Sequence, residues 1–185
     1  MAEAANPYAP PSAQLAAPGG ARSPFFAVGQ VKFSVLAGLT FSIYAQIWAY
    51  YSWRAIRERT GERLSPLARA FFAPITNFAL FARLDREARA AQLRGFPALL
   101  TALAYLLANF AFLLRQPWGT LIPLAAFLAF VPANGAALRI NRALAPDAPD
   151  LAPWTALNAV MAVLFGLLFL LVIIALAIGV VLGIE

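Results

Sequence analysis

The chain has 185 residues, of which 62% are hydrophobic and only 12% are charged, and its formal net charge is +6. A soluble domain carries about 25% charged residues, so this composition argues against a soluble protein and favours an integral membrane protein. The chain has no cysteine and no histidine. Disulfides, thiolate nucleophiles, thiolate or imidazole metal sites and imidazole acid–base catalysis are therefore excluded. We expect no metal site, no cofactor and no enzymatic activity.

Residues 1–24 are rich in Ala, Pro and Gly and contain no apolar core of a secretory signal. Such a segment cannot bury enough surface to offset the entropy lost on ordering. We therefore predict a disordered tail over residues 1–24, followed by a single helical membrane domain over residues 25–184.

Four long runs carry no formal charge: residues 33–53, 96–114, 116–138 and 151–184. A membrane-spanning helix needs about 20 apolar residues. The last run is longer than the bilayer requires, so its start near Trp154 is expected in the headgroup region. We predict an all-α integral membrane bundle of four transmembrane helices, at about 33–53, 96–114, 117–138 and 156–182.

The second half of the first predicted span is aromatic. Aromatic side chains concentrate at the membrane–water interface because their rings prefer the headgroup layer. We interpret this group as an interfacial belt and keep a ligand-stacking site as the alternative; its members are Tyr44, Trp48, Tyr50, Tyr51 and Trp53.

Nine of the fourteen Lys and Arg residues fall within the single segment 54–95. Positive residues in short loops stay on the cytoplasmic side, and this rule alone explains the cluster. Docking on anionic lipid head groups is the second interpretation, and binding of an acidic protein or nucleic acid is the third. We predict a cytoplasmic segment, no nucleic-acid partner, and a set of candidate membrane-surface residues: Arg54, Arg57, Arg59, Arg63, Arg69, Arg83, Arg86, Arg89 and Arg94.

Local signals subdivide this basic segment. The i, i+4 pair of Arg54 and Glu58 indicates that the first helix continues into water, and Gly61 is a natural helix stop. Ser65 and Pro66 form a typical helix start, with serine as the N-cap.

Residues 67–82 have an amphipathic pattern. The apolar residues Leu67, Phe71, Ile75, Phe78 and Phe81 share one side of a helical wheel. An interfacial helix lying in the membrane plane is favoured. A re-entrant hairpin broken at Pro74 and a full span remain as alternatives.

The next elements are predicted from charge spacing and turn residues. Asp85 and Arg89 stand at i, i+4 within a charged helix that is expected to end at Gly95. Residues 115–119 are typical of a tight turn, so the second and third spans should form an antiparallel hairpin. Residues 143–153 contain three prolines and are predicted to be a loop.

Four spans would place both termini outside. The segment 54–95, Arg139 and Arg142 would share the cytoplasmic side, whereas Arg22, Lys32 and Arg115 would lie opposite, a split of 11 to 3. If the segment around Pro74 also spanned the membrane, the split would be 8 to 6. The positive-inside rule therefore favours four spans.

No ionisable residue lies within the four runs, which argues against a proton-coupled transporter and against intramembrane hydrolysis. Polar amides and small residues at four-residue spacing are typical of helix contacts in lipid. The small residues fit packing within one chain and contact between copies equally well. The candidate helix-packing residues are Asn109, Asn134, Asn158, Ala175, Gly179 and Gly183.

Several short segments together resemble a known family. They are Lys32-Phe33, Leu39–Tyr44, Tyr50–Trp53, Arg59–Glu62, Leu64–Pro66 and Arg69–Pro74. This signature, over about residues 30–85, is similar to that of a family of small uncharacterised bacterial multi-pass membrane proteins. The resemblance implies a bacterial membrane protein and supplies no activity, substrate or catalytic residue.

These observations predict a scaffold or accessory subunit of the bacterial cytoplasmic (inner) membrane. Its basic segment would lie against the anionic inner leaflet. The expected partners are the lipid bilayer, anionic head groups, and a second copy of the chain or a larger membrane complex. The alternative is a small oligomeric transporter or channel for a neutral or lipidic solute.

Overall fold

The computed structural model describes residues 23–146 and 154–183, and every regular element within these ranges is helical. The predicted tail lies outside the described residues, apart from positions 23 and 24, and so does most of the predicted loop 143–153. The elements are α1 (Gln30–Leu39), α2 (Ile43–Thr60), α3 (Pro66–Phe71), α4 (Ala73–Ala90), α5 (Ala98–Phe110), η1 (Ala111–Leu113), α6 (Trp118–Leu124), η2 (Ala126–Ala129), α7 (Phe130–Leu144) and α8 (Ala156–Leu182).

The all-α class is confirmed, but the prediction of four transmembrane helices is wrong. Two segments of the described chain are long and apolar enough to cross a membrane. They are Trp118–Leu144, which contains α6, η2 and α7, and Ala156–Leu182, which is α8. The apolar segments Gln30–Leu39 and Ala98–Leu113 are shorter.

The first predicted span is interrupted in its middle. α1 ends at Leu39, and Phe41 and Ser42 then adopt positive φ angles of 53° and 67°. The Thr40 hydroxyl donates to the Leu36 carbonyl and accepts from the Tyr44 amide, which secures the turn. α1 has 10 residues, or about 15 Å of helix, and is therefore too short to cross a slab of about 30 Å.

The two ends of this α1–α2 hairpin lie at the same end of the molecule. The guanidinium carbon of Arg59 is 5.1 Å from the ring centroid of Phe25, and these residues bracket the predicted span. The chain therefore returns to the side from which it enters α1. Phe25 and the start of the basic segment therefore lie at the same end of the described chain, although a span was predicted between them.

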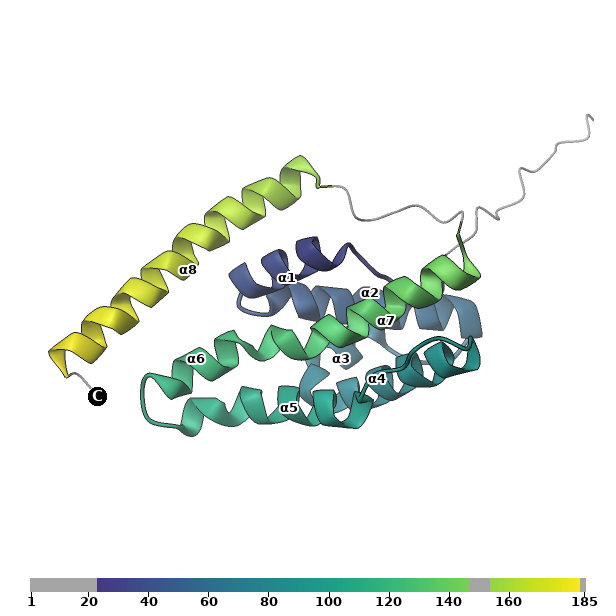
Figure 1. The fold of residues 1–185 in the computed structure, drawn as a ribbon, viewed down its shortest axis with the longest axis horizontal. Helices are drawn as coiled ribbons and strands as arrows, with labels where there is room; N and C mark the ends of the chain where they lie inside the picture. Colours follow the sequence, from purple (N-terminus) through teal and green to yellow (C-terminus); the bar gives the residue numbers. More distant parts are fainter. Residues whose placement is uncertain (1–22, 147–153, 184–185) are drawn as a thin grey trace, which may run out of the picture.

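The turn predicted over residues 115–119 is present and joins two antiparallel arms, α5–η1 and α6–η2 (Figure 1). The amides of Trp118 and Gly119 both donate to the Arg115 carbonyl. A Cβ atom at Gly119 would lie 2.5 Å from the carbonyl oxygen of Leu114, so the turn requires glycine there. The predicted hairpin is confirmed.

The core of the bundle is aromatic and surrounds Phe130 of α7. Trp48 of α2, Phe81 of α4 and Tyr105 of α5 pack edge-on against the Phe130 ring, with centroid distances of 5.9, 5.3 and 4.8 Å. These side chains are almost fully buried. The interfacial belt predicted around Trp48 and Trp53 is therefore wrong for the two tryptophans, which pack inside the protein.

Helix α3 begins as predicted: the Ser65 side chain accepts from the amide of Ala68, and Pro66 occupies the first helical position. The chain breaks at Phe72, and α4 then continues through the charged residues to Ala90 rather than to Gly95. A full span over 67–82 is contradicted, because no candidate span covers this part of the described chain.

The side of α3 and α4 that was expected to face lipid is only partly exposed. Leu67, Phe71 and Ile75 are exposed, by 71%, 75% and 68%. Phe81 belongs to the same predicted side but is buried, because α4 packs against α2, α5 and α7. One end of this segment therefore presents apolar side chains outward while the other enters the bundle.

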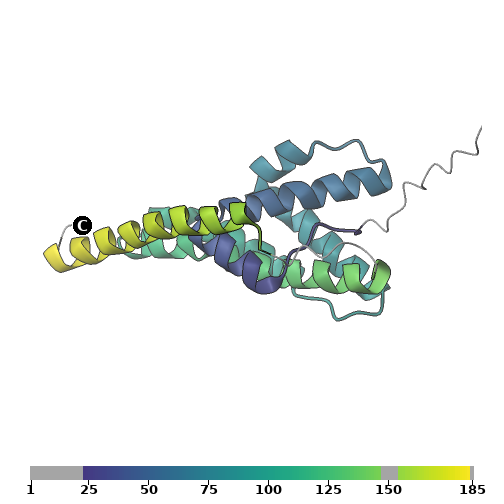
Figure 2. The same cartoon turned by 90° about the horizontal axis from the view of Figure 1, so that it is seen from above.

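Helix α8 lies along the outside of the bundle and has no buried residue (Figure 2). It approaches α1, where the Phe169 and Phe41 ring centroids are 5.8 Å apart. Its C-terminal half lies beside the α5–α6 turn and lines a cavity of about 460 Å³ together with Gln116 and Pro117. Three predicted helix-packing residues, Ala175, Gly179 and Gly183, line this cavity.

Candidate functional site

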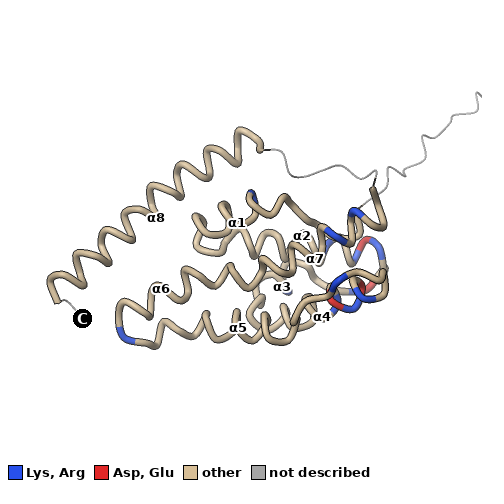
Figure 3. The backbone as a smooth tube through the Cα atoms, viewed as in Figure 1, with Lys and Arg blue, Asp and Glu red and all other residues tan. Residues whose placement is uncertain are grey.

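Most of the charged residues gather at one end of the molecule, whereas Lys32 lies on α1 (Figure 3). We define the charged end as the last turns of α2, α4 and α7 together with residues 91–97. Cations are stabilised near helix C-termini, where backbone carbonyls point outward, so three such termini suit a cluster of arginines. Arg115 lies at the opposite end, in the turn between α5 and α6.

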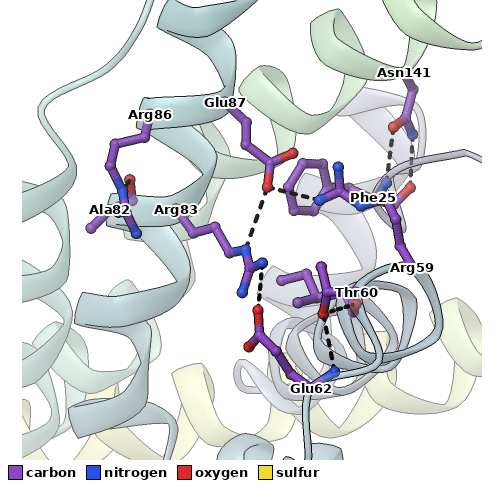
Figure 4. Close-up of polar contacts among 10 residues, drawn as sticks. Phe25, Arg59, Thr60, Glu62, Ala82, Arg83, Arg86, Glu87 and Asn141 are labelled. Atoms are coloured by element: carbon purple, nitrogen blue, oxygen red, sulfur yellow. Dashed lines mark hydrogen bonds and ion pairs between the residues drawn. The ribbon is translucent and has the colours of Figure 1, made fainter.

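A network of ion pairs connects α2 to α4 (Figure 4). Arg59 Nη2 lies 2.7 Å from Glu87 Oε1, and Arg83 Nε approaches the same oxygen at 3.4 Å. Arg83 Nη2 also lies 2.7 Å from Glu62 Oε1, in the loop after α2. Arg83 therefore joins two carboxylates that come from different elements.

A second set of contacts fixes the entry to α5. Asp85 Oδ1 accepts from the amide of Phe96 at 2.8 Å, and its Oδ2 accepts from Arg89 Nε at 2.8 Å. A Cβ atom at Gly95 would lie 2.2 Å from Asp85 Oδ1. Gly95 therefore permits the close approach of the loop to Asp85 and is not the end of α4.

The arginines lower the pKa values of two of these carboxyl groups. The hydrogen bond from Arg83 is the main cause for Glu62, and the hydrogen bond from Arg89 is the main cause for Asp85, with a further contribution from the Phe96 amide. Arg54 pairs with Glu58 at 2.8 Å. Each of the four carboxylates in the described chain thus has an arginine partner, and we call this α2–α4 region the paired side.

The extended segment before α1 is held against α7 by two asparagines. Asn141 Oδ1 accepts from the Phe25 amide at 3.1 Å, and its Nδ2 donates to the Phe25 carbonyl at 2.8 Å. Two helical turns earlier, Asn134 makes the same two contacts with Val28, at 3.2 and 2.8 Å. The amide side chains thus satisfy backbone groups as a neighbouring strand would.

Asn134 also connects α7 to α2. Its Oδ1 accepts from Trp48 Nε1 at 2.9 Å, and its Nδ2 donates to Gln30 Oε1 at 3.0 Å. Asn134 is fully buried. Sequence reasoning selected Asn134 but missed Asn141, although the spacing of seven residues on one helix places both on the same side.

The other two predicted amides make local contacts. Asn109 Nδ2 donates to the Tyr105 carbonyl of its own helix at 2.8 Å. Asn158 and Thr155 form a capping box at the start of α8. Among the three asparagines selected from the sequence, Asn134 is the one whose side chain bonds to other elements of the described chain.

The nine candidate surface arginines fall into distinct groups. Arg54, Arg59, Arg83 and Arg89 form ion pairs. Arg86 donates to the Ala82 carbonyl, and the guanidinium carbon of Arg69 lies 4.2 Å from the centroid of the Trp53 ring. The remaining three are exposed and form no ion pair within residues 23–146 and 154–183: Arg57, Arg63 and Arg94.

Arg94 lies near Arg139 and Arg142 of α7, two arginines that entered the sequence analysis only in the count that predicted membrane orientation. Arg94, Arg139 and Arg142 line a cavity of about 590 Å³ between the start of α5 and α7. Arg139 Nη2 donates to the Arg94 carbonyl at 2.9 Å, while its Nε is buried and has no acceptor in the described chain. We call these three residues and their cavity the open side, because none of them pairs with a described carboxylate.

Comparisons with protein-family models, curated protein sequences and solved structures gave no match to this chain. The resemblance of residues 30–85 to small bacterial membrane proteins therefore stays a prediction.

Proposed function

We propose that this protein is a multi-pass scaffold or accessory subunit of the bacterial cytoplasmic membrane, with its charged end in the cytoplasm beside the anionic leaflet. The separation of charge from apolar surface is the observation that supports this proposal. Most charged residues lie at one end of the molecule, whereas α8 has no buried residue and carries exposed leucines, isoleucines and valines along its length. Lipid is the solvent in which such a helix is stable.

The proposed topology has three crossings: the two segments that are long enough to span a membrane, and the shorter α5–η1 segment, which packs against α6 and η2. α5 with η1 runs outward from the charged end, α6 to α7 returns, and α8 runs outward again. The hairpin α1–α2 enters from the charged side and returns to it, and α3 with the start of α4 reaches only into the upper apolar layer. Eleven arginines, those of segment 54–95 together with Arg139 and Arg142, then lie inside, and Arg115 lies outside.

The state of the carboxylates supports a non-catalytic role. A general acid or base works best with a pKa near the operating pH. The pKa values of Glu62 and Asp85 are shifted downward, away from neutrality, by their arginine partners. Glu62 and Asp85 are thus poorly suited to proton transfer, and their contacts with Arg83 and the Phe96 amide connect elements of the fold.

The alternative, an oligomeric path for a neutral solute, was suggested by the three asparagines and the small residues of α8. Asn134 satisfies the backbone of the segment before α1, Asn109 bonds within its helix, and Asn158 caps α8. These contacts use the amide groups that a solute would need. We therefore favour the scaffold.

Alkaline carbonate extraction of membranes containing the full chain tests the proposal. Because α8 and the α5–α7 hairpin would be embedded in the bilayer, we expect the protein to stay in the pellet with a known multi-pass protein. Release into the supernatant together with a peripheral control protein would contradict membrane integration.

A further inference from the structure

We infer that the open side is a binding site for one anionic glycerophospholipid, whose phosphate lies among Arg94, Arg139 and Arg142. This inference deepens the proposed function and rests on it, because it requires the charged end to lie at the membrane surface. It moves the lipid contact from the broad segment 54–95 to a defined cavity that includes two arginines of α7.

The first observation is uncompensated positive charge in a concave site. Three guanidinium groups line one cavity, and none forms an ion pair within the described residues. By contrast, all four described carboxylates are engaged on the paired side. A phosphate diester suits this arrangement because guanidinium groups bind phosphate oxygens in a planar, two-pronged manner.

The second observation is unmet hydrogen-bonding capacity at the same place. Arg139 Nε is buried and lacks an acceptor in the described chain. The first turn of α5, which begins beside the cavity at Pro97, has no side-chain cap. An anion in the cavity would be stabilised by the positive end of α5 and by the charge of Arg139, whose Nε itself is shielded from the cavity.

The third observation distinguishes a lipid from a soluble phosphate. Phe96, Pro97, Val131 and Pro132 line the same cavity as the arginines. Phe96 and Pro97 also line an adjoining hollow that begins beside Asp85, Arg86 and Arg89 and continues along α5 past the exposed leucines Leu99, Leu100 and Leu103. An acyl chain leaving the arginines would therefore follow an apolar path on a helix that the proposed topology places in the bilayer. Basic pockets of this kind between helices at the cytoplasmic surface are typical of anionic lipid sites.

The space in the cavity depends on a small residue at position 135. Gly135 of α7 lines the cavity, and a Cβ atom there would meet Arg139 Nη1 at 3.5 Å and Gln30 Oε1 at 3.7 Å, which are ordinary contacts. Alanine is therefore tolerated at this position, whereas a leucine would fill part of the cavity without changing any charge.

The test uses the full chain purified in mild detergent and titrated with dioleoyl phosphatidylglycerol, with the bound lipid counted by native mass spectrometry. We expect R94Q/R139Q/R142Q to weaken the apparent affinity about tenfold or more, since each arginine near an anionic lipid contributes measurably. The matched control R54Q/R57Q/R63Q removes the same charge from the same end but away from the cavity, and should change the affinity less than about threefold.

Two further variants keep the test decisive if the triple variant unfolds. R142Q removes a side chain that forms no ion pair in the described chain and should weaken binding about fivefold. G135L should weaken binding while G135A should not. Equal losses in the cavity and control variants, or unchanged binding in R142Q and G135L, would overturn the site.

The source of the phosphate is tested by competition. Glycerol 3-phosphate at millimolar concentration should not displace the phospholipid, and phosphatidylcholine should bind more weakly than phosphatidylglycerol. Displacement by glycerol 3-phosphate would overturn the lipid assignment in favour of a soluble anion. A chain that resists carbonate extraction yet binds no phosphatidylglycerol would overturn this site alone, whereas carbonate release would overturn the proposed function.

Discussion

The two sides of the charged end use the same residue type differently. On the paired side, Arg59 and Arg83 of α2 and α4 share Glu87, and Arg83 also binds Glu62. On the open side, Arg94, Arg139 and Arg142 surround a cavity, and no described carboxylate reaches them. Arginine density alone therefore does not identify a surface for anions; the position of the carboxylates decides which arginines remain available.

Replacement of Asn134 by alanine should produce the largest effect, because this residue joins α7 to α2 and to the segment before α1. Its loss leaves the Val28 backbone groups and Trp48 Nε1 buried without their partner. We expect the free energy of unfolding to fall by about 3 kcal/mol, measured by denaturant titration in detergent. Asn141→Ala, on the same side of α7 but half-buried, should cost only about 1 kcal/mol. Equal losses of unfolding free energy in the two variants would contradict the assignment of Asn134 as the main connection between α7, α2 and the segment before α1.

The ion-pair network provides a second test of the paired side. Glu87→Ala removes the shared acceptor of Arg59 and Arg83, two side chains from different helices. We expect the free energy of unfolding to fall by about 1 to 2 kcal/mol, as measured by denaturant titration in detergent. The same variant should bind phosphatidylglycerol at least as well as the unaltered chain, because it frees arginines; weaker binding would contradict the division into two sides.

Acidification should reduce the stability that the ion pairs of the paired side give to the fold. The pKa values of Glu62 and Asp85 lie below their ordinary values of 4.5 and 3.8 in the folded protein. Groups with lowered folded pKa values stabilise the protein at neutral pH, and this stabilisation disappears as the pH falls through those values. The free energy of unfolding, measured between pH 7 and pH 3, should fall with the pH. This fall should be smaller in E62Q/D85N than in the unaltered chain. An unchanged acid profile in that variant would contradict the assignment.

The smallest effect is expected at the exposed pair of Arg54 and Glu58, whose side chains are 49% and 43% exposed. Glu58→Gln should change the free energy of unfolding by less than about 0.5 kcal/mol. Glu58→Gln serves as the control for Glu87→Ala. If both variants lost a comparable free energy of unfolding, the difference in exposure between the two ion pairs would not determine their contribution to stability.

Local signals in the sequence were sufficient for several features. The helix stop at Gly61 is confirmed by its φ of 70°. The start at Ser65 and the pairs Arg54–Glu58 and Asp85–Arg89 are also present. These features depend on residues within one or two turns of each other, so their spacing determines them.

The errors arose where contacts between distant segments decide the outcome. The run 33–53 has the length and composition of a span, but the Thr40–Ser42 turn divides it, and the contact of Phe25 with Arg59 shows that the chain returns. Hydropathy cannot distinguish such a hairpin from a crossing helix. The open side was missed because Arg94 and the arginines of α7 are 45 residues or more apart in the chain, as in the Arg139–Arg94 hydrogen bond.

Thiol labelling tests the central claim most directly, since the chain contains no native cysteine. Single cysteines at Ser23, Ala90 and Gln116 would be treated with a membrane-impermeant maleimide in oriented vesicles. The account predicts that positions 23 and 90 react from the cytoplasmic side and position 116 from the opposite side. Reaction of positions 23 and 90 from opposite sides would show that residues 33–53 cross the membrane and would contradict the account.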